Sequence, residues 1–313
     1  MESGQPDQTS FRADRPPILV TGATGRQGGS GRAVVRRLAE AGQPVRALVR
    51  TLDERATALR ELGAEVVVGD FADYPSLLAA LEGVESAYFC YPVAPGIVEA
   101  AGLFATAGRE RGLRRVVDLS LAATRPDHPS PQARAQWVAE QIFEWAGFGG
   151  VHLRIAAFFM ENLLAIDAAV IRTEGRLANS FGSLELPWLS GADVGALAAA
   201  LLLDPGAVTE RVLVAGGAER LAYPELARII SEVAGRPVHY EELTPDAWHG
   251  ELVARSAAGG EANVRGADHL VAQSRALRAN PIPALADRVA ELTGRTPVTF
   301  RRFVELHRAE LAG

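Results

Sequence analysis

Short apolar runs and amphipathic helical patterns alternate along the first two thirds of the chain. An uninterrupted apolar run such as Ile18–Val20 is typical of a parallel strand buried on both faces, and the helical spacing of Ala33, Val34 and Leu38 follows it. The expected strands cover residues 18–20, 45–50, 65–69, 86–90, 114–119, 151–155 and 211–215, and the helices between them cover 33–40, 53–62, 75–81, 95–111, 132–145 and 193–203. This alternation predicts an α/β fold, a doubly wound parallel sheet with right-handed crossovers and helices on both faces.

The regular alternation breaks down after Ile155. An apolar stretch covers residues 156–164, a hairpin or loop is expected at 175–188, and helices are expected at 224–234, 245–256, 268–278, 284–292 and 299–311. Asp193 is the expected N-cap of the helix predicted at 193–203. We therefore expect a disordered tail at 1–15, a sheet domain at 16–155 that residues 189–216 complete, and a smaller, mainly helical lobe at 156–313. The glycine-containing segment 256–266 is the expected mobile element.

The turn after the first strand carries the clearest chemical signal. Gly22, Gly25 and Gly28 follow the spacing Gly-x-x-Gly-x-x-Gly between a buried strand and a helix. Such a turn lets the backbone approach a diphosphate, whose charge faces the positive end of the helix. The pattern predicts a dinucleotide site, although Gly29–Gly31 extends the glycine run and leaves two possible helix starts, Gly28 or Gly31.

The ends of the next two strands indicate which dinucleotide binds. Arg50 stands where an NAD site places an acidic residue, so the position suits a 2′-phosphate and favours NADP(H). A solvated arginine at a strand end is the alternative. Asp70 and Phe71 end the third strand, where they could contact the adenine amino group and ring, although an Asx turn at Asp70 accounts for the aspartate equally well.

Composition restricts the partners. The formal net charge is −6 with no clustered basic run, which argues against nucleic acid and favours a small-molecule ligand. The single cysteine, Cys90, has apolar neighbours and is expected to be a buried structural thiol in a reducing compartment. The polar first 15 residues lack the features of a signal or transit peptide and no apolar stretch is long enough to span a membrane, so we expect a cytoplasmic protein without a membrane partner. The sequence does not indicate an oligomeric state.

The basic residues limit the possible catalysis, because all 32 Lys and Arg positions are arginine. Without lysine, neither a Schiff base nor a Tyr/Lys proton-donating dyad can form. The histidines show no metal-ligand spacing, so no metal site is expected. Only His128, in the loop after the fifth strand, is placed to approach a ligand.

Several stretches together resemble the NmrA-like group of atypical short-chain dehydrogenases. They are TGATGRQGGS (21–30), VRALVR (45–50), VVVGDF (66–71), RRVVDLS (114–120) and LRIAAFFMENLL (153–164), and the likeness extends through Asp193-Val194 and 235–240 to 292–304. The resemblance implies a Rossmann domain with a small helical lobe. It also implies an NADP(H) site at Gly22, Thr24, Gly25, Arg26, Gln27, Gly28, Arg50, Asp70 and Phe71, to which the position of the fourth strand end adds Tyr91 and Pro92.

The chain departs from many members of this group at its proposed catalytic helix. Relatives often carry His or Lys four residues before a Glu that corresponds to Glu140, but here that position is Gln136, which transfers no proton at neutral pH. Our leading hypothesis is an NADPH-dependent reductase of a small apolar carbonyl, enone or quinone, and the alternative is an NADP(H)-binding redox sensor or a protein that uses the nucleotide structurally. The expected catalytic residues are Ser120, Gln136 and Asn162; the alternatives are that Ser120 contacts only the cofactor and that Asn162 caps the backbone. The expected substrate contacts are Tyr91, Phe158, Met160 and Asn162, although a core position is the safer interpretation for Phe158 and Phe159.

Overall fold

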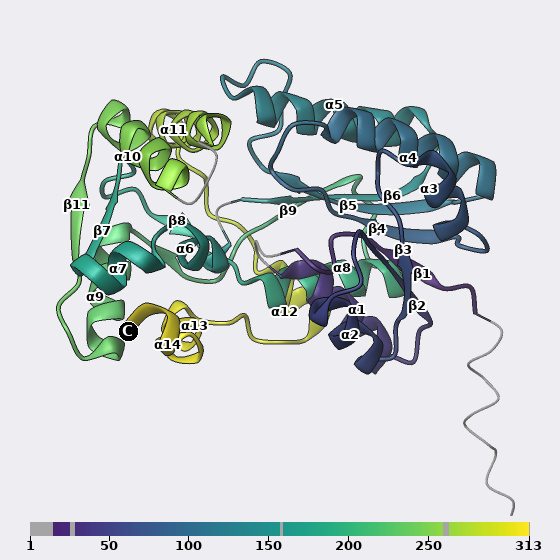
Figure 1. The fold of residues 1–313 in the computed structure, drawn as a ribbon, viewed down its shortest axis with the longest axis horizontal. Coiled ribbons are helices and arrows are strands. Elements are labelled where there is room, and N and C mark those ends of the chain that lie inside the picture. The colour runs from purple at the N-terminus through teal and green to yellow at the C-terminus, as the bar shows by residue number, and fades with distance from the viewer. Residues whose placement is uncertain (1–14, 26–28, 157–158, 259–262, 313) are drawn as a thin grey trace, which may run out of the picture.

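The computed structural model describes residues 15–25, 29–156, 159–258 and 263–312. Its main feature is a seven-stranded sheet in which all neighbours pair in parallel, in the order β3-β2-β1-β4-β5-β6-β9 (Figure 1). The strands are β1 (Ile18–Val20), β2 (Val45–Val49), β3 (Glu65–Val68), β4 (Ser86–Phe89), β5 (Arg115–Leu121), β6 (Gly149–Ile155) and β9 (Val212–Ala215). This order is that of a Rossmann fold, and the predicted doubly wound α/β class is confirmed.

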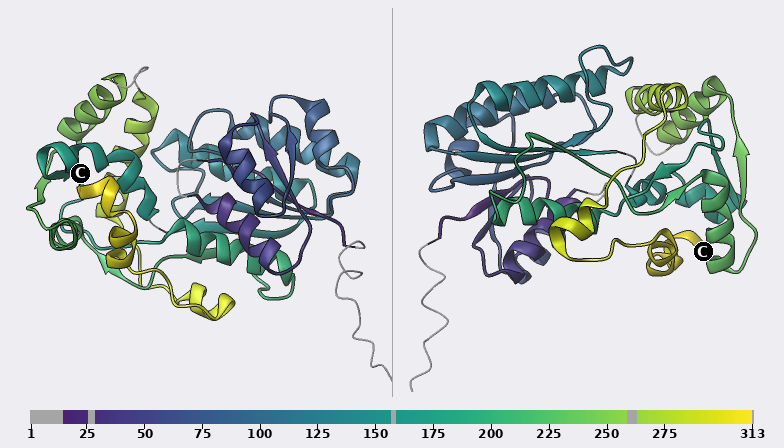
Figure 2. Two further views of the ribbon diagram at one scale, coloured as in Figure 1. Left: turned by 60° about the horizontal axis from the view of Figure 1, so that its bottom comes forward. Right: turned by 180° about the vertical axis from the view of Figure 1, so that it is seen from behind.

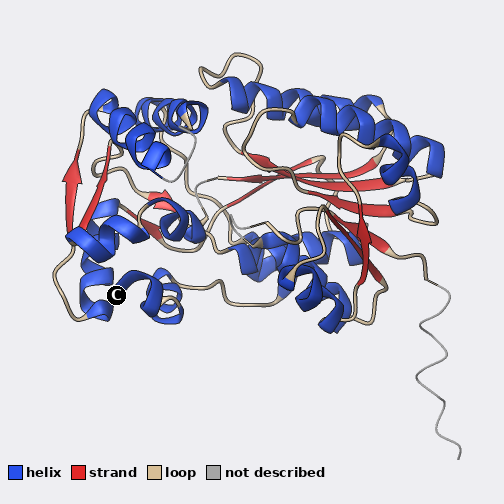
Figure 3. Ribbon diagram, in the orientation of Figure 1, coloured by secondary structure: helices blue, strands red, loops and turns tan. Residues whose placement is uncertain are grey.

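Helices cover both faces of the sheet, as the alternating sequence pattern predicts (Figure 3). One layer consists of α1 (Ser30–Glu40), α2 (Glu54–Glu61), α8 (Gly191–Leu203) and α12 (Arg288–Thr293); the other consists of α3 (Tyr74–Ala80), α4 (Ile97–Arg111) and α5 (Pro131–Trp145). Each layer has its own apolar core against the sheet. Because both faces are buried, the central strands carry apolar residues on both sides.

The remaining elements form a lobe that lies beyond the carboxyl ends of the strands (Figures 1 and 2). They are α6 (Met160–Ile166), α7 (Ala168–Glu174), β7 (Arg176–Asn179), β8 (Leu186–Pro187), β10 (Arg220–Leu221), α9 (Tyr223–Ala234), β11 (His239–Glu242), α10 (Pro245–Ala258), α11 (Val264–Ala279), α13 (Phe300–Leu306) and α14 (Arg308–Ala312). A third apolar core, which includes Trp188, Phe181 and Phe300, holds the lobe together. The chain leaves the lobe twice, once for α8 and β9 and again for α12.

The part of the chain after residue 156 differs from the sequence prediction in three places. Of the hairpin or loop expected at 175–188, the hairpin does not form, because β7 pairs in parallel with β11 and β8 pairs with β10, and both partners come from later parts of the chain. The helix predicted at 284–292 begins only at Arg288, where Asp287 accepts a hydrogen bond from the Ala290 N–H. The helix predicted at 299–311 is two helices, α13 and α14, separated at His307.

Two helix starts also differ from those expected. Helix α1 begins at Ser30, between the two starts that the glycine run left open, with Gly29 as its N-cap in the left-handed region (φ 58°). Helix α8 begins at Gly191, and its N-cap is Ser190, whose hydroxyl accepts a hydrogen bond from the Asp193 N–H. Asp193 therefore lies in the first turn, where its carboxylate accepts a hydrogen bond from Ser190.

Helix α5 is joined to β5 and β6 by buried ion pairs. His152 Nδ1 lies 2.5 Å from Asp118 Oδ1, and its Nε2 lies 2.8 Å from Glu144 Oε1. Arg154 pairs with Glu140, which is fully buried. Each charge in this network faces an opposite charge, as burial of charged groups requires.

Among the described residues, no helix is both long enough and apolar enough to cross a membrane.

We predict that Gly195→Ala destabilises the sheet domain. A Cβ at Gly195, in α8, would overlap Ala33 Cβ and lie 2.9 Å from Ser30 O, so the tightly packed helices α1 and α8 would have to separate. Overpacking of this kind costs about 1–3 kcal/mol. Gly102→Ala in α4 is the matched control, because a Cβ there meets nothing within 4 Å. Denaturant unfolding should show a loss only for Gly195→Ala, and equal stability of the two variants would contradict the packing described here.

A second prediction concerns the pH dependence of stability. Burial lowers the pKa of His152, but Asp118, Glu140 and Glu144 outweigh burial and raise it from 6.5 to about 9. The ion pairs of His152 therefore stabilise the fold fully below its unfolded pKa, and this stabilisation is lost as the pH rises through the folded pKa. The stability advantage of the wild type over His152→Gln should fall by up to roughly 3 kcal/mol between about pH 6 and about pH 10. An advantage that does not change over this range would show that His152 is not charged in the fold.

Candidate functional site

A large cavity lies between the carboxyl ends of the parallel strands and the lobe. Its volume is about 1770 Å³, which exceeds the usual size of a small-ligand pocket and leaves room for a dinucleotide and a second molecule. Its walls come from the turn after β1, from the ends of β2 to β6, and from α5, α6, α7, α10 and α11. This position, outside the carboxyl ends of the strands, is where open α/β sheets bind their ligands.

The glycine turn forms one end of the cavity. Gly22 adopts a left-handed conformation (φ 69°) and approaches β4 so closely that a Cβ would lie 3.0 Å from Cys90 Cβ. Thr21 fixes this approach, since its hydroxyl oxygen accepts a hydrogen bond of 2.8 Å from the Cys90 N–H. Thr24 and Gly25 also line the cavity. Three further predicted cofactor residues, Arg26, Gln27 and Gly28, lie outside the described residues.

Gly31 allows helix α1 to pack closely against the turn after β1. A Cβ at Gly31 would lie 2.7 Å from Gly22 O and 2.9 Å from Ala23 Cα, so only glycine fits there. The buried hydroxyls of Tyr88 and Ser30 meet at 3.0 Å and join the first turn of α1 to β4. The amino end of α1 is thereby directed toward the turn that borders the cavity, as phosphate binding requires.

Two arginines lie at the rim beside this turn. Arg50 is exposed at the end of β2 and, within the described part of the chain, pairs with no carboxylate. Arg55, from the first turn of α2, also lines the cavity; it donates a hydrogen bond to Thr24 O and pairs with Asp53. Sequence reasoning missed Arg55, because nothing in the local pattern shows that it reaches back to the glycine turn.

The predicted adenine and nicotinamide contacts also lie on the cavity wall. Asp70 forms the Asx turn that was its alternative role, with Oδ1 accepting a hydrogen bond of 2.9 Å from the Ala72 N–H. Phe71 packs against the rings of Phe89 and Tyr91, with centroids 5.2 and 5.5 Å away. Tyr91 and Pro92 follow β4 and line the cavity with it.

Ser120, at the end of β5, is bonded to the buried ionic network. Its hydroxyl donates to Glu140 Oε1 at 2.5 Å, and Glu140 in turn receives two hydrogen bonds from Arg154. A hydroxyl has one proton, so in this arrangement Ser120 can accept a hydrogen bond from a ligand but has no proton left to donate. Its predicted catalytic role stays a prediction, with Ser120 placed as a hydrogen-bond acceptor toward the cavity.

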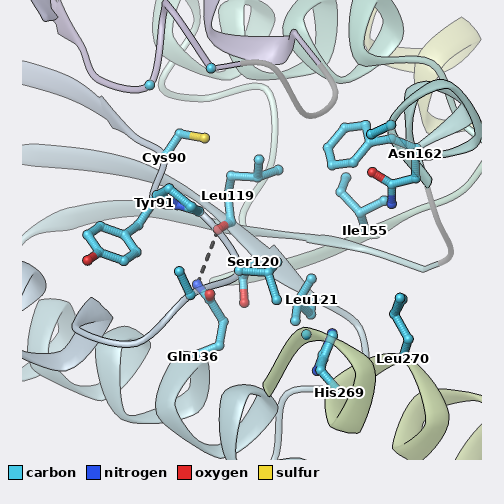
Figure 4. A pocket seen from close by; sticks show the side chains of 18 of the residues that line it. Cys90, Tyr91, Leu119, Ser120, Leu121, Gln136, Ile155, Asn162, His269 and Leu270 are labelled. Carbon is cyan, nitrogen blue, oxygen red and sulfur yellow. Dashed lines mark hydrogen bonds between the residues drawn. The ribbon is translucent and has the colours of Figure 1, made fainter. Parts of the chain in front are cut away.

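Gln136 and Asn162 present amides to the same region (Figure 4). Gln136 is buried, and one amide N–H donates to Leu119 O at 3.2 Å, which leaves the second N–H for another acceptor. Asn162, in α6, is half-buried and its side chain points toward the cavity from the lobe.

The apolar stretch after β6 contributes differently from the prediction. Met160 is fully buried in the core of the lobe with Leu163 and does not line the cavity, because the first turn of α6 directs it inward. Phe159, its neighbour, lines the cavity instead. Phe158 lies outside the described residues.

Two histidines reach the cavity from different parts of the chain. His128 is fully buried in the loop before α5, and its Nδ1 accepts a hydrogen bond from the Ser130 N–H. His269, in α11, lines the cavity with its Nδ1 2.7 Å from Ser130 Oγ. Sequence reasoning missed His269, because a contact across 139 residues leaves no local signal.

Cys90 and a cluster of three buried side chains have features of a reactive thiol and of a metal site. Cys90 is half-buried and lines the cavity, and burial raises the pKa of its thiol to about 11, which favours the protonated form at neutral pH. Ligand atoms of Asp118, Glu140 and His152 lie within 4.8 Å of one another, as in a metal site. Both ring nitrogens of His152 already face carboxylates and Arg154 pairs with Glu140, so this cluster is an ion-pair network.

Comparison with known proteins yields relatives that match over nearly the whole chain. One is an NAD(P)H azoreductase from Xenophilus azovorans, 31% identical over 93% of this chain and 98% of the relative. Another is a (4-alkanoyl-5-oxo-2,5-dihydrofuran-3-yl)methyl phosphate reductase from Streptomyces griseus, 35% identical over 93% of this chain and 97% of the relative. Both relatives are reductases by name, and the first is named for its use of NAD(P)H.

A solved structure has the same fold. An NADPH-dependent quinone oxidoreductase from Escherichia coli, complexed with NADPH, superposes with a TM-score of 0.77 at 22% identity, over 93% of this chain and 99% of the other. The family model described as the NmrA-like family matches residues 15–257. The match covers most of the chain and agrees with the resemblance inferred from its motifs, so the chain belongs to the NmrA-like family.

Proposed function

We propose that this protein is an NADPH-dependent reductase of small, largely apolar conjugated acceptors such as enones and quinones. The observation that carries the proposal is the continuous cavity, which runs from the glycine turn to an apolar chamber under the lobe. The relatives that act on an azo compound and on an unsaturated furanone phosphate support this class of acceptor, since both acceptors are conjugated.

The residues at the sheet end fit the cofactor. The close approach at Gly22 and the amino end of α1 suit a diphosphate, and Arg50 and Arg55 offer two guanidinium groups for a 2′-phosphate. Asp70 has a second carboxylate oxygen beyond its Asx turn, and Tyr91 and Pro92 line the wall toward Ser120. When bound, NADPH supplies a hydride from its nicotinamide ring.

The acceptor chamber is apolar and contains few proton donors. Its apolar wall includes Leu119, Ile155, Phe159, Ile166, Val170, Leu252, Leu270 and Leu285. Gln136 replaces an ionisable residue on α5, and the Ser120 hydroxyl is engaged by Glu140. A site of this kind favours acceptors that spread the arriving negative charge over a conjugated system, because they need no strong acid beside the reacting atom.

The reaction balances without a further co-reactant. The acceptor gains a hydride with its two electrons and one proton, and NADPH becomes NADP⁺. The amides of Gln136 and Asn162 hold the acceptor oxygen, and water supplies the proton after the charge has formed.

We predict that Arg50→Ala removes most of the preference for NADPH over NADH. Loss of a charge-assisted bond to the 2′-phosphate should weaken NADPH binding roughly 10- to 100-fold and leave NADH binding nearly unchanged. Arg60→Ala, on α2 but outside the cavity lining, is the matched control. Titration by nucleotide fluorescence measures both affinities, and equal binding of NADPH and NADH by the wild type would exclude this role for Arg50.

We also predict that conjugated acceptors stimulate NADPH oxidation far more than saturated ketones do. The test panel contains a naphthoquinone, a cyclic enone, an azo dye and a saturated ketone, and the loss of nicotinamide absorbance gives the rate for each. The rates with the conjugated compounds should be at least about tenfold higher than with the saturated ketone. A tenfold difference in rate requires only about 1.4 kcal/mol of additional charge stabilisation. Background rates for the whole panel, with NADPH binding intact, would contradict the reductase and favour a nucleotide sensor.

A further inference from the structure

His269 links the lobe to the sheet domain at the edge of the acceptor chamber. It lies near the start of α11 and is only 7% exposed, and its ring lines the cavity near Ser120 and Leu121 (Figure 4). Its Nδ1 meets the hydroxyl of Ser130, the N-cap of α5. Gln136 follows Ser130 by six residues on the same helix, about 9 Å along its axis, so His269 and Gln136 border the same chamber.

The hydrogen bonds around Ser130 determine which nitrogen of His269 carries the proton. Ser130 Oγ accepts a hydrogen bond from the Ala133 N–H, and the Ser130 N–H donates to His128 Nδ1. Among the described residues, the acceptor left for the Ser130 hydroxyl proton is His269 Nδ1, at 2.7 Å. A neutral imidazole that accepts at Nδ1 carries its proton on Nε2, so His269 is an N–H donor at the nitrogen that Ser130 does not hold.

His269 is neutral at physiological pH. Burial, and then the nearby His128, lower its pKa to about 4. A neutral imidazole transfers no proton easily, but its N–H is an effective hydrogen-bond donor to a carbonyl oxygen in a dry site.

Two further polar side chains, His128 and Gln273, line the cavity beside His269. Gln273 lies one turn after His269 on the same face of α11. Their unpaired atoms, His128 Nε2 and Gln273 Oε1, are themselves shielded from the cavity, so the ligand contact inferred here rests on His269 alone.

We propose that His269 is a catalytic residue that donates a hydrogen bond from Nε2 to the oxygen of the bound acceptor and stabilises the negative charge that reduction places there. This inference rests on the proposed reductase function for its kinetic consequence. Its binding consequence is separate, because the donor should also hold an oxyanion that cannot be reduced. The same contact with Ser130 also attaches α11 to α5, so the experiment has to separate donation to a ligand from attachment of the lobe.

Two variants of His269 separate these roles. The amide of Asn reaches only as far as Nδ1, so His269→Asn keeps a partner for Ser130 and removes the donor in the chamber. The longer side chain in His269→Gln places an N–H near the position of Nε2. His239→Asn is the control, since His239 lies on β11, is exposed, and does not line the cavity.

The full-length holoprotein is used for two measurements. The first is kcat and KM for NADPH oxidation with a naphthoquinone. The second is the Kd with which the NADP⁺-saturated protein binds para-nitrophenolate, an oxyanion that accepts no hydride. Binding is followed by the visible absorbance of the nitrophenolate. We expect His269→Asn to lower kcat about 100-fold and to weaken nitrophenolate binding roughly tenfold or more, whereas His269→Gln and His239→Asn stay within a few-fold of the wild type.

Wild-type values for His269→Asn in both measurements would overturn the proposal and leave the reductase function intact. Equal losses in His269→Asn and His269→Gln, accompanied by a lower unfolding temperature, would also overturn it, since they would show attachment of the lobe only. The wild type could also fail to oxidise NADPH with any of the acceptors tested while nitrophenolate binding still depends on His269. In that case the reductase function fails and the donor role of His269 stands. If the wild type neither turns over nor binds nitrophenolate, both proposals fail.

Discussion

The contact between the start of α1 and the turn after β1 determines how this molecule is arranged. Gly31 lets the helix lie against Gly22 O where any Cβ would be too close, and Gly195 lets α8 pack on the other side of the same helix. These two contacts leave the amino end of α1 at the carboxyl edge of the sheet. Arg50 at β2 and Ser120 at β5 lie along that same edge, whereas Asn162 and His269 reach the cavity from the lobe.

Much of this arrangement could be predicted from the sequence, because strand, turn and helix signals of a parallel sheet are local. The parts that could not be predicted depend on long-range contacts. Arg55 reaches the glycine turn only through the bend after β2, and His269 meets Ser130 only after the lobe has folded. The prediction of Asp193 as the N-cap of α8 was wrong, but the sequence contains the signal for the observed N-cap, Ser190. Ser190 precedes Asp193 by three residues, a spacing typical of a capping box.

The polar groups of the cavity show why a reductase without lysine is chemically reasonable. Glu140 is buried, pairs with Arg154 and accepts a hydrogen bond from the Ser120 hydroxyl, so both groups already have partners within the protein. The amides of Gln136 and Asn162 and the ring of His269 are neutral groups that line the cavity, together with the charged side chains of Arg125 and Arg255. Neutral donors stabilise developing charge without a change of protonation, which suits acceptors that are already conjugated.

The proposed function requires that a hydride pass directly from one face of a nicotinamide, held at the strand ends, to an acceptor under the lobe. Two forms of NADPH, each deuterated at a different hydrogen of C4, test this claim when they are oxidised with a naphthoquinone and the NADP⁺ is weighed by mass spectrometry. A nicotinamide held with one face toward the chamber predicts complete loss of deuterium from one form and complete retention in the other. Equal partial loss from both forms would contradict the account, because it would show that no fixed face of the ring meets the acceptor.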